Sequence, residues 1–88
     1  MDSIKYRYPL VEVIWDDPQG TSGWQAPPKE LKPTPMLSVG FLVKKTDKHI
    51  MLAACYETGD VDISSTDTIP VGTIISMKQL KVSYGKKI

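Results

Sequence analysis

The chain has 88 residues, of which 41% are hydrophobic and 24% charged, and its formal net charge is +1. A chain of this length has room for one hydrophobic core, so we predict a single soluble domain over residues 1–88. A net charge so close to zero argues against a dedicated duplex-DNA binder, whose contact face is strongly basic.

The sequence also carries signals about the compartment. Its single cysteine, Cys55, cannot form an intrachain disulfide, whereas secreted domains of this size usually carry several. The polar first eight residues do not resemble a signal peptide. No apolar run reaches the ~20 residues that a membrane span requires. We therefore expect a cytoplasmic protein with no membrane partner.

The first predicted strand covers residues 10–16. Val11, Val13 and Trp15 alternate with three other residues, two of them acidic, which is typical of a strand with one apolar face.

Residues 17–36 contain five of the seven prolines. That density excludes a strand or a long helix, so we predict a long loop. It contains Trp24, for which two interpretations stay open. The indole could cover one end of the core, which is the interpretation we favour, or offer a stacking platform to a base, worth ~1–3 kcal/mol.

The clearest pattern is a β-hairpin, with strands over 37–45 and 50–56 and a turn over 46–49. Gly40, inside the first of these strands, indicates a sharp bend or a close backbone contact. The second strand is apolar on both faces and should therefore be central.

The rest of the chain completes an all-β pattern. Residues 57–67 are polar and read as a loop with a short strand near 61–63, and residues 66–69 read as a fourth strand. A helical turn at 70–72 precedes a fifth strand over 73–80. We predict a small, strongly bent five-stranded β-barrel with a long first loop and a tight helical turn before the last strand.

Two segments resemble known small barrels. Residues 40–52 look like the first motif of Sm-like proteins, with Gly40, Leu42, Asp47 and Met51 at matching positions. Residues 69–75 resemble the final strand pair of the same barrels and the turn before the last strand of Src-homology 3 barrels. RNA-binding Sm proteins have asparagine where this chain has Leu52, so the resemblance implies the fold without the uridine pocket.

A looser similarity is to short bacteriophage and prophage proteins. They share a Ser/Gly-Trp loop, here at 22–24, a hairpin like that at 40–53, and an Ile-Pro-x-Gly like that at 69–72. Some compact phage proteins sequester nucleotides of host immune signalling. The resemblance implies such a role in the host cytoplasm.

Catalysis finds little support in the sequence. His49 and Cys55 lie on a turn and near the far end of the next strand, roughly 20 Å apart at ~3.3 Å per residue. We expect a solvated histidine and a buried thiol rather than a nucleophile system. One histidine and one cysteine do not make a zinc site. We predict no enzymatic activity, no metal and no cofactor.

Two groups of residues are candidates for binding. The first joins the loop to the hairpin turn and would hold an anionic ligand; it consists of Ser22, Gly23, Trp24, Lys44, Lys45, Asp47 and His49. The second is a basic and aromatic patch, expected because the first and last strands of such barrels lie close together; it consists of Lys5, Tyr6, Arg7, Tyr84 and Lys86. Scattered lysines that only confer solubility remain the simpler alternative.

The functional hypothesis is a non-catalytic binding protein, phage-related and homo-oligomeric, that holds a small anionic ligand or a host partner. An immune signalling nucleotide is its sharpest version. Two alternatives stay open: an Sm-like single-stranded nucleic-acid binder, and a structural or peptide-docking module that uses Trp24.

Overall fold

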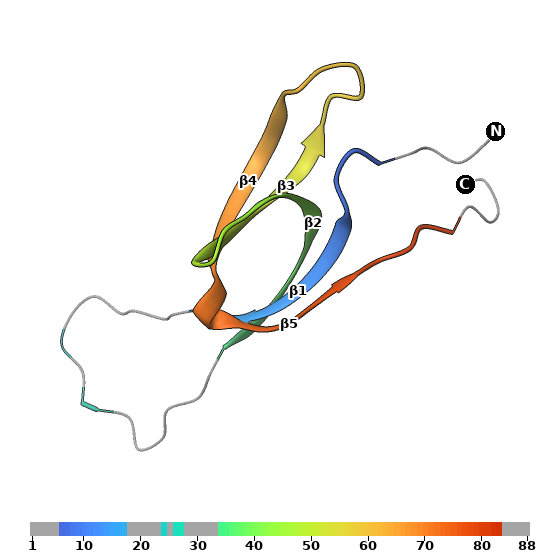
Figure 1. Ribbon diagram of the computed structural model, residues 1–88. Coiled ribbons are helices and arrows are strands. Elements are labelled where there is room, and N and C mark those ends of the chain that lie inside the picture. The colour runs from blue at the N-terminus through green and yellow to red at the C-terminus, as the bar shows by residue number, and fades with distance from the viewer. Residues whose placement is uncertain (1–5, 18–23, 25, 28–33, 84–88) are drawn as a thin grey trace.

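A computed structural model describes residues 6–17, 24, 26–27 and 34–83. They form an all-β structure (Figure 1), and no helix among them is long and apolar enough to cross a membrane. Its elements are β1 (Leu10–Asp16), β2 (Pro35–Lys45), β3 (His49–Tyr56), β4 (Ile63–Pro70), the 3-10 turn η1 (Val71–Thr73) and β5 (Ile74–Gln79).

The five strands make one antiparallel sheet in the order β4-β3-β2-β1-β5. The prediction that the first and last strands are neighbours is confirmed, because β1 pairs with both β2 and β5. The apolar strand β3 lies inside the sheet, between β2 and β4. Strands β4 and β5 are the two edges.

The prediction of a closed, strongly bent barrel is wrong. Closure requires hydrogen bonds between the two edge strands, and β4 and β5 are not neighbours in the sheet. Figure 1 shows the reason: the chain turns at η1, and β4 and β5 then run apart from each other. Each edge strand is engaged on its inner side only, β4 with β3 and β5 with β1.

The core lies on one face of the sheet. Val11 and Val13 of β1 are buried there with Ile50 and Leu52 of β3 and Ile69 of β4. Partly buried apolar side chains pack around this cluster, namely Trp15, Leu42, Val71, Ile74 and Met77. The alternation of β1 thus points its valines and Trp15 into the core, as the sequence predicts. Full burial of such a side chain stabilises the fold by about 1.5–3 kcal/mol.

Two strands are longer than predicted. Strand β2 begins at Pro35, opposite Asp16, and a proline is tolerated there because the first residue of a strand can lack an N–H donor. Strand β4 begins at Ile63, opposite Tyr56, so the predicted polar loop shortens to a turn. Ser64, Thr66 and Thr68 pair with β3 through their backbones although their side chains are polar.

Irregularities bend the central strands without closing the sheet. The register shifts between Leu42 and Lys44 in β2, and between Ile14 and Trp15 in β1. At Gly40 an added Cβ would lie 3.1 Å from the carbonyl oxygen of Ala53. The predicted close backbone contact at this glycine is therefore confirmed.

Candidate functional site

The β2–β3 turn carries four of the predicted ligand-binding residues. Lys44, Lys45, Asp47 and His49 are all exposed there. Thr46 organises the turn: its Oγ1 accepts hydrogen bonds from the backbone N–H of His49 at 3.0 Å and of Lys48 at 3.3 Å. The backbone N–H groups of Lys48 and His49 are thus already used within the turn itself.

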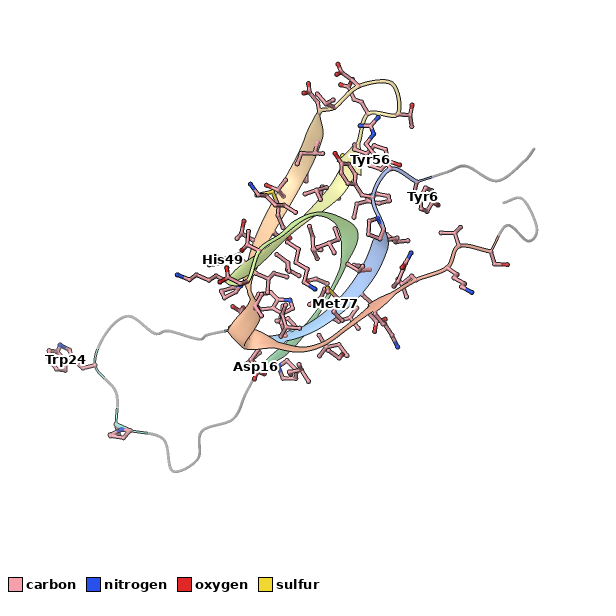
Figure 2. The ribbon with its side chains drawn as sticks, viewed as in Figure 1. Tyr6, Asp16, Trp24, His49, Tyr56 and Met77 are labelled. Carbon is pink, nitrogen blue, oxygen red and sulfur yellow. The ribbon has the colours of Figure 1, made fainter. Side chains whose placement is uncertain are left out.

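Trp24 does not cover the core. Its side chain is fully exposed, at 104% of the reference area, and Figure 2 shows it well away from the sheet. The favoured interpretation of this indole as a core residue is therefore wrong. Trp15 is the tryptophan that packs on the core, and its Nε1 donates to Ser38 Oγ at 3.0 Å. Ser22 and Gly23 lie outside the described residues.

The structure assembles an aromatic cluster that the sequence analysis missed. It consists of Tyr6, Tyr8, Phe41 and Tyr56. Phe41 meets Tyr6 at 5.7 Å and Tyr56 at 5.0 Å between ring centroids, and Tyr56 meets Tyr8 at 5.4 Å. All three contacts are edge to face, the geometry that aromatic pairs prefer. The cluster joins the segment before β1 to β2 and to the end of β3.

Arg7 ties this cluster to the turn between β3 and β4. Its guanidinium lies 5.2 Å from the ring centroid of Tyr56 and donates to the carbonyl oxygens of Thr58, at 3.2 Å, and Asp60. The backbone N–H of Arg7 donates to the Tyr56 hydroxyl at 3.2 Å. Figure 2 shows Tyr56 and Tyr6 at this end of the sheet.

Of the predicted basic and aromatic patch, the structure describes Tyr6 and Arg7. Tyr6 packs on Phe41. Arg7 is exposed, and its guanidinium donates to carbonyl oxygens of the β3–β4 turn. Lys5, Tyr84 and Lys86 lie outside the described residues. The signal that was available, and missed, is that Phe41 and Tyr56 sit on strands predicted to form one hairpin.

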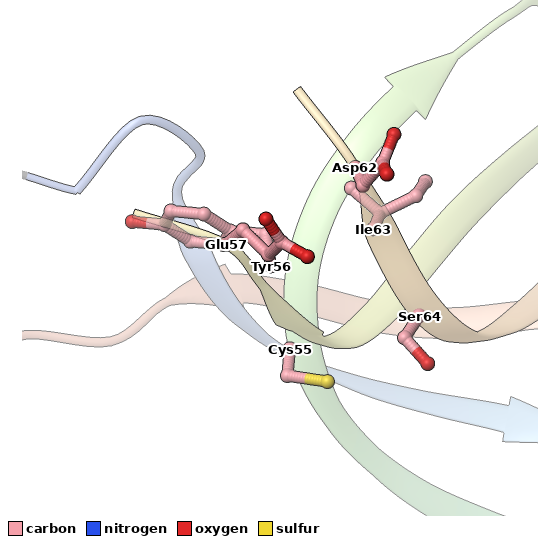
Figure 3. A pocket seen from close by; sticks show the side chains of 6 residues that line it. All are labelled: Cys55, Tyr56, Glu57, Asp62, Ile63 and Ser64. Carbon is pink, nitrogen blue, oxygen red and sulfur yellow. The ribbon is translucent and has the colours of Figure 1, made fainter. Parts of the chain in front are cut away.

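A shallow pocket of about 410 Å3 opens between the ends of β3 and β4 (Figure 3). Two carboxylates, Glu57 and Asp62, stand in its lining and disfavour an anionic ligand. The complete lining is Cys55, Tyr56, Glu57, Asp62, Ile63 and Ser64.

The expectation of a buried thiol is wrong. Cys55 is exposed because it lies opposite Ser64, near the end of β3 and beyond the core residues Ile50 and Leu52. His49 lies at the other end of the same strand. Among the residues that the structure describes, no group of three or more histidine, cysteine or acidic side chains could hold a metal ion.

Comparisons with protein-family models, with curated proteins and with solved structures found no match to this chain. The resemblances to Sm-like, Src-homology 3 and phage proteins therefore stay predictions, and the all-β antiparallel sheet is the part of them that the structure shows.

Proposed function

We propose that this chain is a non-catalytic binding protein that captures a protein partner through its β1–β2 connection, with Trp24 as the anchor. One observation carries the proposal: the indole of Trp24 is fully exposed. Tryptophan is enriched among the few interface residues that supply most of the binding energy. An indole offers a large apolar surface together with one N–H donor, which suits insertion into a pocket of a partner.

The root of the connection supports this role. Asp16 of β1 and Pro35 of β2 pair directly, and one step further out the N–H of Asp17 donates to the carbonyl oxygen of Thr34 at 3.1 Å. The connection therefore leaves the sheet from a fixed base. Binding residues are often found on loops that a rigid scaffold holds in this way.

The geometry favours a protein partner over a small anionic ligand. Lys44 and Lys45 are exposed at the end of β2, and the pocket between β3 and β4 carries Glu57 and Asp62. Within the described part of the chain, a sequestered nucleotide would bind against two carboxylates or on an open surface. If the resemblance to phage proteins is correct, the partner is a host protein of the cytoplasm.

Nucleic-acid binding of the Sm-like type has less support. The ring of Phe41 already contacts those of Tyr6 and Tyr56 edge to face, which leaves less of their faces open for a base to stack on. Arg7, which would contact phosphate, donates to two backbone carbonyls instead.

Capture experiments test the proposal. Immobilised protein is incubated with lysate of the host cell, and the retained partner is identified by mass spectrometry and then purified. Its affinity is measured for the native chain, Trp24→Ala and the matched control Val61→Ala, whose side chain is also exposed at 77%. We expect Trp24→Ala to weaken binding by about 2 kcal/mol or more, at least ~30-fold, and the control to bind as the native chain does.

Equal binding by Trp24→Ala would contradict the proposal. Heat released on titration with cyclic or adenine-based nucleotides, unaffected by Trp24→Ala, would instead favour the small-ligand version.

A further inference from the structure

We infer that a second copy of this chain docks on the side of the sheet that faces away from the core, across β1, β2 and β5. We call this surface the outer face. It consists of Glu12, Ile14, Leu37, Val39, Ser76 and Lys78.

The strand register places these residues on one side. Ile14 lies opposite Leu37 on β2 and Ser76 on β5, and directly paired residues of neighbouring strands point to the same face. Glu12 likewise lies opposite Val39 and Lys78. The residues that alternate with them on β1, Val11 and Val13, are buried in the core, so the outer face points away from it.

The outer face is more apolar than a solvated face of a sheet should be. An antiparallel sheet with one face in water usually alternates apolar and polar side chains. On β2, however, Leu37 and Val39 both point outward and are 61% and 53% exposed. Phe41, next in the same row, is covered by the ring of Tyr6. The row is thus apolar along its length, and among the described residues Leu37 and Val39 keep more than half of their surface exposed.

The charge of the outer face fits a second copy. Lys78 and Glu12 are an ion pair on this face, with Nζ and Oε1 3.5 Å apart. Asp16, the next residue of the same row on β1, borders the face and has a buried carboxylate oxygen. In a two-fold contact the same patch meets itself. A patch that carries one cation and one anion can then place each opposite its counterpart in the other copy. A nucleic acid would meet one lysine beside a carboxylate, which is a poor match.

The two edge strands of the sheet differ in how well they are protected against pairing with another chain. The edge strand β4 has the features that discourage pairing: Ser65 with a φ of 55°, Pro70 at its end, and mostly polar side chains. The edge strand β5 has no proline, and its Ile75 is 58% exposed. The less protected edge therefore borders the outer face.

Analytical ultracentrifugation over a range of protein concentrations tests the inference. We expect the native chain to sediment as a dimer at about 100 μM, and Leu37→Lys/Val39→Lys as a monomer, because two buried lysines per copy would lack partners. Both positions are exposed in the single chain, so the circular-dichroism spectrum should stay that of the native sheet. Val61→Lys is the control, since it adds a lysine at an exposed valine in the β3–β4 turn.

A charge exchange gives a second readout. Lys78→Glu should weaken the dimer because it brings carboxylates together across the two-fold axis, and Lys78→Glu/Glu12→Lys should restore it. A monomeric native chain, or a dimer that survives Leu37→Lys/Val39→Lys, would overturn the inference. Trp24→Ala should leave the dimer intact. A failure of the dimer inference is therefore distinguishable from a failure of the proposed partner capture by Trp24.

Discussion

At Gly40 the sheet has no room for a side chain. A Cβ there would lie 3.1 Å from the carbonyl oxygen of Ala53 and 3.2 Å from Leu52 Cβ, and both belong to the paired strand β3. We expect Gly40→Ala to lower the free energy of unfolding by about 1–3 kcal/mol, the usual cost of overpacking. Urea denaturation followed by circular dichroism would measure it.

Gly72 is the matched control, because a Cβ there would meet nothing within 4 Å. Gly72→Ala should change the free energy of unfolding by less than about 0.5 kcal/mol. Equal effects at the two glycines would show that backbone entropy, rather than crowding against β3, decides the outcome at Gly40.

The two tryptophans show when a sequence pattern predicts the burial of a side chain and when it does not. Trp15 follows two valines at a spacing of two, and this alternation correctly placed it at the core. Trp24 stands among prolines and glycines, where no periodicity indicates which side of a chain faces inward. Its complete exposure could not be derived from the sequence for that reason.

Among the elements, the turn between β3 and β4 depends on a residue that lies 51 and 53 positions before the two residues it contacts. Arg7 donates to the carbonyls of Thr58 and Asp60. We expect Arg7→Met to speed hydrogen exchange of the amides of Glu57 and Asp60 by about 5–30-fold, corresponding to ~1–2 kcal/mol of local stability. The exchange of β1 and β2 should not change, because Arg7 lies outside both strands.

Lys45→Met provides the control, since it removes an exposed cation at the end of β2, far along the sheet from this turn. Unchanged exchange of Glu57 and Asp60 in Arg7→Met would mean that the turn holds itself through the hydrogen bond from Glu57 N to Asp62 O at 3.1 Å.

Strands were easier to predict than their arrangement. Alternation and turn residues are local, and they located all five strands within a few residues, except for the start of β4, whose polar side chains resemble a loop. Whether the sheet closes depends on how β4 and β5 leave the turn at Val71–Thr73, and no local pattern encodes that angle. The aromatic cluster was missed for a related reason: its rings come from three separate segments.

For the whole molecule, the described core is one cluster shared by β1, β3 and β4, and the single domain over residues 1–88 stays a prediction. Such a core should melt as a unit. In Trp24→Ala the fluorescence of the exposed indole is removed. The fluorescence of Trp15 then reports on the core cluster alone. We expect its fluorescence and the far-ultraviolet ellipticity to follow one coincident urea transition.

The free energy of unfolding at a concentration where the chain is monomeric should be about 4–6 kcal/mol, at the lower end for domains, because few residues are fully buried. Raising the protein concentration should move the transition to higher urea, since a dimer stabilises the folded state by mass action. In Leu37→Lys/Val39→Lys the midpoint should be independent of concentration. Two separated transitions, with Trp15 reporting only one, would divide the sheet into independently folding parts and contradict the single domain.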